Sequence, residues 1–214
     1  MRLYNPLNVI LNNEIKIKLL RFLSRTSGEW SGRRLAKEIN VSPAACHKAL
    51  SELQKEGVLQ LKKIGRTYLY SLNQNNILVK NLLKPLYKKE QMIPLTLANI
   101  IRKMPPYVKK RVVSLGIFGS ISRRKEHPSS DIDLLVIVKE KKDKRLLEET
   151  LEKFNVVITR RYGNILSPYI QTVQEIRSKF KKRLPLIRNI IHEHRLIFGK
   201  PLISVIHGCK KNQK

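Results

Sequence analysis

One segment in the second half of the chain constrains the fold more than any other feature. Residues 112–118 are largely apolar and predict a strand, and Gly119 and Ser120 follow it directly, predicting a sharp turn into a helix. Backbone N–H groups and a hydroxyl at such a helix start can hold phosphate oxygens. Arg123 lies nearly one helical turn further on and can reach the same anion. The segment therefore predicts a phosphate-binding turn at the end of a strand.

A pair of aspartates follows shortly after this turn. Asp131 and Asp133 begin a second apolar stretch, residues 131–138, which predicts a buried strand. Because side chains alternate along a strand, both carboxylates lie on one face. Two carboxylates beside phosphates suit Mg²⁺, which can activate an attacking oxygen and neutralise a leaving pyrophosphate. The alternative is a loop whose aspartates only cap the strand.

The whole stretch, GSISRRKEHPSSDIDLLVIV, resembles nucleotidyltransferases of the DNA polymerase β type, especially their minimal members. Their pattern is Gly-Ser, a small residue and Arg-Gly, followed by Ser-Asp-X-Asp, and every spacing matches. The resemblance implies nucleotide binding by Gly119, Ser120, Arg123 and Ser130, and catalysis and metal binding by Asp131 and Asp133. It also implies Mg²⁺-dependent transfer of a nucleoside monophosphate from a nucleoside triphosphate (NTP) to an acceptor.

The sequence departs from that family at two positions. The glycine that usually follows the arginine is Arg124 here. Active members also carry a third carboxylate on a later strand, but this chain has no acidic residue between Glu152 and Glu175. Glu175 is expected in the following helix. The candidate strand, residues 165–171, offers one face made of Ser167, Tyr169 and Gln171. The family resemblance therefore leaves the rate of catalysis open, because general-base help is commonly worth about 10²–10⁴-fold.

The first third of the chain has a different pattern. Helices are predicted for residues 14–25, 32–39 and 43–56, with Ser31 and Ser42 as N-caps and Pro43 at a first helical position. Gly57 ends the third helix. Two alternating stretches, 58–64 and 67–72, then predict a β-hairpin. Three helices and a hairpin in this order are typical of a winged helix-turn-helix domain.

This region resembles winged-helix transcriptional regulators of the archaeal and bacterial kind. In the third helix, Cys46, Ala49, Leu50 and Leu53 share one face and are expected in the core. The opposite face and the hairpin tip are expected to contact double-stranded DNA. The expected DNA-binding residues are Ser42, Ala44, His47, Lys48, Ser51, Lys62, Lys63 and Arg66. Because the same fold also mediates protein contacts, docking to a protein stays an alternative.

The charge balance agrees with anionic partners. The chain has 44 basic and 16 acidic residues, a net charge of +28, and both halves are strongly basic. A polyanion such as nucleic acid or an NTP is the expected partner, although a lysine-rich genome would produce the same bias. No apolar run approaches the roughly 20 residues of a membrane span. Two distant cysteines, Cys46 and Cys209, match no metal-ligand spacing, which favours a reducing, cytoplasmic setting.

These observations predict an α+β chain: an N-terminal winged-helix domain followed by a nucleotidyltransferase domain with a mixed sheet. The expected boundaries are a winged helix at 1–73, a helical linker at 74–108, a nucleotidyltransferase domain at 109–203 and a basic tail at 204–214. Within the second domain we expect a helix at 143–154, a strand at 156–160 and a helix from 174 to 197 broken at Pro185. His192-Glu193-His194 is expected on the surface, since residues two apart on a helix cannot easily share a metal.

Three functions stay open at this point. The first is an enzyme that transfers a nucleotide to an unknown acceptor, with the winged helix directing it to DNA. The second is a transcriptional regulator whose weak or inactive transferase site senses a nucleotide. The third is an antitoxin-like protein paired with a small helical toxin, as minimal nucleotidyltransferases often are. A homodimer is expected only because DNA-binding proteins of this class commonly dimerise.

Overall fold

The computed structural model describes residues 2–207 of the 214-residue chain and divides into two compact units, Met1–Pro94 and Leu95–Lys214. Each unit has its own apolar core, and both combine helices with a sheet, as the predicted α+β class requires. Cys209 lies outside the described residues. No described helix is both long and apolar enough to cross a membrane.

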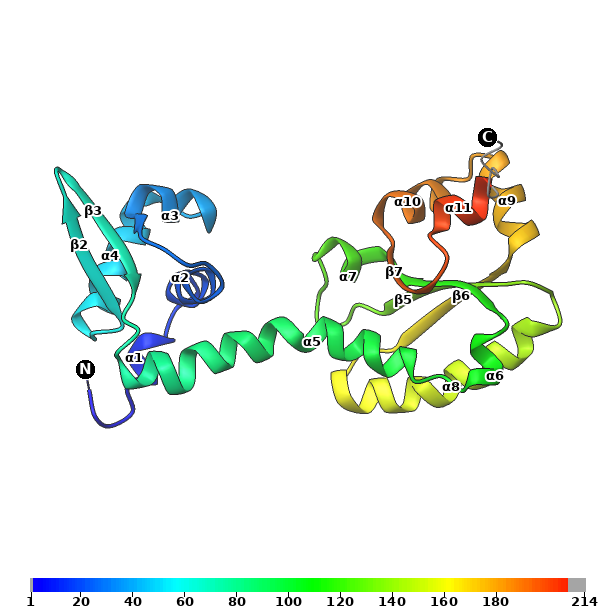
Figure 1. Ribbon diagram of the computed structural model, residues 1–214, viewed down its shortest axis with the longest axis horizontal. Helices are drawn as coiled ribbons and strands as arrows, with labels where there is room; N and C mark the ends of the chain where they lie inside the picture. Colours follow the sequence, from blue (N-terminus) through cyan, green and yellow to red (C-terminus); the bar gives the residue numbers. More distant parts are fainter. Residues whose placement is uncertain (1, 208–214) are drawn as a thin grey trace, which may run out of the picture. The chain divides into compact units, whose positions relative to one another are not determined.

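The first unit contains short helices around a three-stranded antiparallel sheet, in the order β1-β3-β2 (Figure 1). Its elements are α1 (Leu7–Ile10), α2 (Glu14–Arg25), β1 (Trp30–Ser31), α3 (Gly32–Glu38), α4 (Pro43–Lys55), β2 (Leu59–Ile64) and β3 (Thr67–Leu72). Side chains of Asn13, Ser31 and Ser42 accept hydrogen bonds from the first turns of α2, α3 and α4. These caps satisfy N–H groups that a helix start leaves unpaired.

The core of the first unit confirms the expected inner face of α4. Cys46, Ala49, Leu50 and Leu53 are at most 2% exposed and pack with apolar residues of α2, α3 and the hairpin. Burial also raises the pKa of the Cys46 thiol, so this cysteine is a packing residue and a poor nucleophile.

Residues 74–108, expected as a helical linker, are largely helical, and each end of this stretch packs into one of the two cores. A π-helical turn, η1 (Val79–Leu83), continues into the long helix α5 (Lys84–Arg102), and α6 (Pro106–Lys109) follows. The beginning of this region packs into the first core through Leu78, Val79, Leu83 and Tyr87. Its end packs into the second unit through Leu97, Ile100, Ile101, Met104 and Val108. The apolar spacing along α5 thus supplies both cores, which a solvated connector would not do.

The second unit is built on a four-stranded mixed sheet with the order β6-β5-β4-β7. Its strands are β4 (Val112–Ile117), β5 (Ile132–Val138), β6 (Leu166–Thr172) and β7 (Arg195–Gly199). β4 pairs antiparallel with both β5 and β7, whereas β5 and β6 are parallel. Helix α8 (Asp143–Tyr162) makes the crossover that a parallel pair requires.

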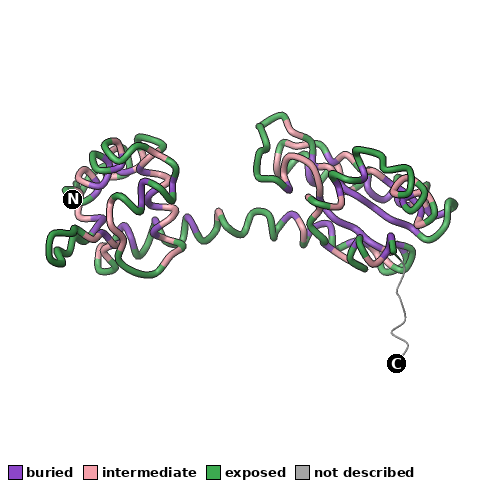
Figure 2. Tube along the Cα trace, turned by 90° about the horizontal axis from the view of Figure 1, so that it is seen from above, coloured by how far each residue is buried: buried purple, intermediate pink, exposed green. Residues whose placement is uncertain are grey.

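Helices cover both faces of this sheet. The remaining helices are α7 (Gly119–Arg123), α9 (Val173–Lys181), α10 (Pro185–Glu193) and α11 (Leu202–His207). Along β5, Leu134 and Val136 face the core under α8, and Leu135 and Ile137 face the core under α9, α10 and α11 (Figure 1). Figure 2 shows the strands of this unit as a buried layer between more exposed helices. Burial on both faces explains the nearly continuous apolar sequence of β5.

Three sequence predictions are wrong in this unit. Residues 156–160 form part of α8, because Ile158 is buried while Val156 and Val157 are exposed, a helical rather than an alternating pattern. Residues 195–199 form strand β7, which pairs with the otherwise open edge of β4. The predicted tail begins too early, since residues up to His207 belong to α11, whose Val205 and Ile206 are buried.

Candidate functional site

The turn after β4 brings backbone and carboxylate into direct contact. Phe118 is extended, and its N–H donates a hydrogen bond to the backbone oxygen of Asp133 at 3.0 Å. Gly119 follows with φ +72° and begins α7. A Cβ on Gly119 would overlap the Asp133 carboxylate and lie 2.9 Å from its Cγ. Glycine is therefore required twice here, for the left-handed backbone and for the close approach.

The two aspartates lie at the start of β5 as the alternation predicted. Ile132 is 1% exposed, Asp133 is half-buried and Asp131 is exposed. Burial raises the pKa of Asp133, the nearby Asp131 carboxylate raises it further, and Arg123 lowers it. Burial and the neighbouring carboxylate both make ionised Asp133 unfavourable, and a bound cation would offset both effects.

The donor set fits a magnesium ion that shares its coordination with a ligand. Among the described residues, no three His, Cys, Asp or Glu side chains are grouped to hold a metal ion. Asp131 and Asp133 would thus provide two carboxylates and leave the other positions to water and phosphate oxygens, which Mg²⁺ prefers. Two carboxylates are therefore a donor set that would need oxygen atoms of a ligand or of water to complete magnesium coordination.

The strand beside β5 shows which side chain lies next to the two aspartates. In the parallel pairing of β5 and β6, Asp133 is in register with Ser167, so the two side chains share a face of the sheet. Tyr169, also proposed from the sequence, is in register with Leu135, one step further from the site. The neighbouring strand therefore presents a hydroxyl, not a carboxylate, beside Asp133.

Glu175 cannot replace that carboxylate. Glu175 lies beyond Thr172, which is in register with Val138. Val138 is five residues along β5 from Asp133, a separation of about 16 Å at ~3.3 Å per residue. The Glu175 carboxylate accepts the Thr172 N–H at 2.8 Å and pairs with Lys144 Nζ at 2.6 Å. Glu175 thus caps α9 at the opposite end of the sheet.

Arg123 is already engaged in the structure. Its Nη1 lies 2.7 Å from Oε2 of Glu193, the last residue of α10, and the hydroxyl of the neighbouring Ser122 donates to the Glu193 backbone oxygen. The sequence predicted only that Glu193 lies on the surface, and no local pattern identified it as a partner of the phosphate-binding turn. His194 is also half-buried, and burial lowers its pKa. Of that triplet, only His192 is exposed as expected.

The other departure from the family pattern lies in the loop between α7 and β5. Arg124 has φ +58° and ends α7 in the left-handed conformation. A glycine adopts this conformation without the roughly 1–2 kcal/mol that a side chain costs there. Ser130 is used within the same loop, since its hydroxyl accepts the His127 N–H at 2.9 Å. Ser120 is half-buried at the start of α7, next to Gly119.

The predicted DNA-binding face of α4 is open. Ala44, His47 and Lys48 are exposed and Ser51 is half-buried, whereas the opposite face forms the core. Ser42 has a structural task as well, because its hydroxyl accepts the Ala45 N–H and caps the helix. The helix thus presents small and basic side chains on one surface, in the form that a major groove admits.

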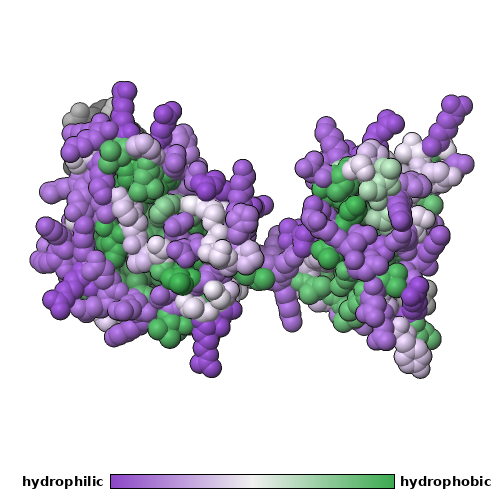
Figure 3. All heavy atoms as spheres, turned by 180° about the vertical axis from the view of Figure 1, so that it is seen from behind, coloured by the Kyte–Doolittle hydropathy of each residue, from purple (hydrophilic) through white to green (hydrophobic). Residues whose placement is uncertain are grey.

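The hairpin tip is exposed but less uniformly cationic than the sequence suggested. Lys62 Nζ lies 3.1 Å from a Glu29 carboxylate oxygen, so its charge is partly neutralised. Lys63 lies over the ring of Tyr68, 5.8 Å from its centroid. Arg66 is exposed in the turn, where Gly65 has φ +57°. Figure 3 shows hydrophilic side chains over most of the visible surface, with smaller hydrophobic patches between them.

A buried lysine, which the sequence reasoning missed, holds α4 in place. Lys16 is 1% exposed, and its Nζ donates to the Val9 backbone oxygen at 2.7 Å and to Asn12 Oδ1 at 3.1 Å. It also lies 2.6 Å from an oxygen of Glu52 on α4 and lowers the pKa of that carboxyl. One ammonium group therefore joins α1, α2 and α4.

The fold and the site together define the class of each unit. A mixed sheet with a Gly-Ser turn held against an Asp-X-Asp strand is the arrangement of a nucleotidyltransferase domain. Three helices followed by an antiparallel hairpin, with an open third helix, are the arrangement of a winged helix-turn-helix domain.

Comparison with known families gives the same answer. A family model described as a nucleotidyltransferase domain matches residues 97–198. A second model, for winged helix-turn-helix DNA-binding domains, matches residues 12–60. The chain therefore carries a winged helix-turn-helix domain followed by a nucleotidyltransferase domain. No curated protein matches the chain.

Solved structures resemble parts of the chain. Reduced HlyU from Vibrio cholerae is 24% identical and covers 39% of this chain and 84% of its own, with a TM-score of 0.35. A homodimeric winged helix-turn-helix domain from Mycobacterium bovis is 16% identical, covering 42% and 75%, with a TM-score of 0.32. A toxin-antitoxin crystal structure with AMP-PNP is 14% identical, covering 53% and 80%, with a TM-score of 0.35. At these scores the likenesses say nothing about function.

Proposed function

We propose that this protein binds DNA through its winged helix and transfers a nucleoside monophosphate from an NTP to an acceptor hydroxyl. The observation that carries the proposal is the contact of the Asp133 carboxylate with Gly119, beside Asp131. In the transfer, the acceptor oxygen forms a bond to the α-phosphorus, the bond to the β-phosphate oxygen breaks, and pyrophosphate leaves. The hydroxyl proton passes to water.

Each residue of the site has a task in this proposal. Backbone N–H groups at Gly119 and Ser120 bind phosphate oxygens at the start of α7. Arg123, once it exchanges Glu193 for the triphosphate, offers a charge-assisted hydrogen bond. Asp131 and Asp133 would hold Mg²⁺, which when bound neutralises the charge that develops on the leaving pyrophosphate.

A second function is favoured by Ser167. Because the strand beside Asp133 offers a hydroxyl and no carboxylate, the site suits binding of a magnesium nucleotide better than rapid proton removal. The protein would then be a regulator whose winged helix responds to the bound nucleotide. Both functions share the nucleotide site and differ in turnover.

Two measurements on the same protein separate these functions. Pyrophosphate release is followed with Mg²⁺ and each of the four NTPs, beside the Asp131→Asn/Asp133→Asn variant. Binding of a non-hydrolysable NTP analogue is measured in parallel by calorimetry. Release by the wild type alone supports transfer. Magnesium-dependent binding without release supports the regulator, and absence of both contradicts the nucleotide site.

A further inference from the structure

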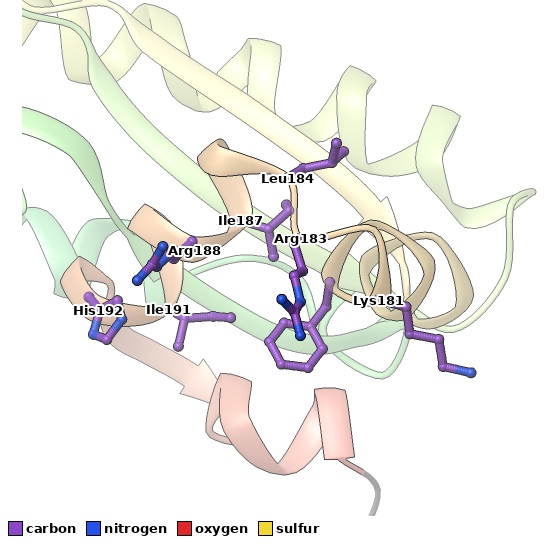
Figure 4. Close-up of a pocket in the computed structure, with 8 residues that line it drawn as sticks. Lys181, Arg183, Leu184, Ile187, Arg188, Ile191 and His192 are labelled. Atoms are coloured by element: carbon purple, nitrogen blue, oxygen red, sulfur yellow. The ribbon is translucent and has the colours of Figure 1, made fainter.

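A cavity lies in the nucleotidyltransferase domain, where the end of α9 meets α10. It has a volume of about 620 Å³, and Figure 4 shows the side chains that line it. Four of them carry nitrogen atoms that can meet an anion: Lys181, Arg183, Arg188 and His192. The volume lies within the range of roughly 300–1,000 Å³ that is usual for ligand pockets.

The positive charges of this cavity have no ion-pair partner among residues 2–207. Within the part of the chain that the structure describes, no carboxylate forms an ion pair with Lys181, Arg183 or Arg188, although Arg123 and Lys144 each have one. Arg183 is held in the left-handed conformation, with φ +53°, at the end of α9. A concave surface with unpaired cations concentrates anions.

The floor of the cavity is apolar. Ile187 is 1% exposed, Ile191 is half-buried, and Leu184 remains 39% exposed at the rim. Unpaired cations around apolar side chains that include the Phe180 ring fit a ligand that carries phosphates and flat, weakly polar faces at once. A single-stranded nucleic acid has this chemistry, whereas an acidic peptide would satisfy the cations and leave the floor without a partner.

Helix α10 connects the cavity to the nucleotide site. His192 lines the cavity, and the next residue, Glu193, contacts Arg123 and Ser122 of the phosphate-binding turn. Arg188 precedes Glu193 by five residues, which is about 7.5 Å along a helix. A strand held by Arg188 is thus within a few nucleotides of the phosphate-binding turn.

We propose that this cavity binds a single-stranded nucleic acid a few nucleotides from its end, and that the terminal hydroxyl of this strand is the acceptor of the transfer reaction. The acceptor role rests on the proposed function, whereas the binding role stands on the cavity itself. RNA and DNA share the phosphates and bases on which the argument depends, so the experiment includes both.

The test compares two charge-matched variants of the full chain. Arg183→Ala/Arg188→Ala removes two cations from the cavity, and Lys153→Ala/Arg160→Ala removes two exposed cations from α8, on the other face of the sheet. Binding of labelled, unstructured oligouridylate and oligothymidylate is measured by fluorescence anisotropy over a series of salt concentrations. Thermal melting confirms that both variants fold.

We expect the cavity variant to bind oligonucleotide at least tenfold more weakly and its salt slope to fall by about 1.4, since each lost phosphate contact on a single strand contributes about 0.7. The α8 variant keeps wild-type affinity. Equal weakening in both variants would overturn the proposal, as would equal competition by an acidic peptide of the same charge.

A final measurement separates this proposal from the proposed function. Calorimetry with a magnesium NTP analogue is repeated on the cavity variant, which keeps the phosphate-binding turn and both aspartates. Normal nucleotide binding with lost oligonucleotide binding supports the cavity. If the wild-type protein binds oligonucleotide through the cavity and releases pyrophosphate from an NTP but never extends the oligonucleotide, the acceptor role is overturned and the binding site is retained. Absence of pyrophosphate release with any NTP contradicts the proposed transfer function instead.

Discussion

Arg123 and Glu193 form an ion pair that joins the phosphate-binding turn to the last residue of α10, with 2.7 Å between Nη1 and Oε2. A triphosphate that uses Arg123 must displace this carboxylate. We expect Glu193→Gln to bind magnesium NTP about two- to fivefold more tightly, because a partly exposed pair contributes roughly 0.5–1 kcal/mol. Calorimetry measures the affinity, with Glu149→Gln on α8 as the control. Unchanged or weaker binding would show that the pair does not compete.

Asp133 is expected to oppose stability when no cation is bound. Its pKa is raised by burial and by Asp131, so the folded state binds its proton more tightly than the unfolded chain does. Stability is therefore lost as pH rises from the ordinary aspartate range through the raised value. Asp133→Asn is expected to melt at a higher temperature than the wild type at neutral pH without Mg²⁺.

The same substitution removes the response to metal and nucleotide. Addition of Mg²⁺ and NTP is expected to stabilise the wild type and to leave Asp133→Asn unchanged. Differential scanning calorimetry with and without the ligands compares the two proteins. Equal stabilisation of both would remove Asp133 from the site.

Ser167→Asp tests whether one side chain limits turnover. The new carboxylate would share a face with Asp133, in register on the neighbouring strand. We expect faster pyrophosphate release, with general-base help of up to about 10²–10⁴-fold. Pro168→Asp adds the same charge on the opposite face of β6 and is expected to have no such effect. A rate that stays at the wild-type value would argue that the limit lies elsewhere.

Arg124 offers a test of backbone strain. Because its φ is +58°, Arg124→Gly should raise the free energy of unfolding by about 0.5–1 kcal/mol, after the entropy that glycine gains in the unfolded chain is subtracted. Lys125 has no positive φ, so Lys125→Gly should be destabilising instead. Urea unfolding of both variants decides the sign, and a loss of stability in Arg124→Gly would contradict the assigned strain.

DNA binding can be assigned to α4 and the hairpin tip by its salt dependence. Lys48→Ala and Arg66→Ala are each expected to weaken duplex binding and to reduce the salt slope by about 0.9. Lys62→Ala should have a smaller effect because Glu29 already pairs with this lysine. If all three variants keep the wild-type slope, the phosphate contacts lie on another surface.

Local features of the sequence were sufficient for much of this architecture. The caps at Ser31 and Ser42, the inner face of α4 and the alternation around Ile132 depend on neighbours within one or two turns, and the structure agrees with them. The errors concern partners distant in sequence. Residues 195–199 form a strand by pairing with the edge of β4 that β5 leaves free, and the sequence of residues 195–199 alone does not indicate this pairing.

The candidate site also combines features that local sequence predicts with contacts between residues distant in sequence. Gly119 and Asp133 belong to one short pattern, so the sequence could place them together. That Ser167 stands beside Asp133 depends on the register between two strands, and the pairing of Glu193 with Arg123 depends on how α10 packs. Neither relationship has a local signature.

The burial of Lys16 affects how a mutational screen for DNA binding is interpreted. Its buried ammonium group fixes the position of α4 through Glu52, yet its side chain is closed to any external ligand. A screen that scores only the loss of DNA binding would recover Lys16 together with Lys48 and would count both as contacts. A companion assay of protein abundance would distinguish them, since only the loss of Lys16 should deplete the folded protein.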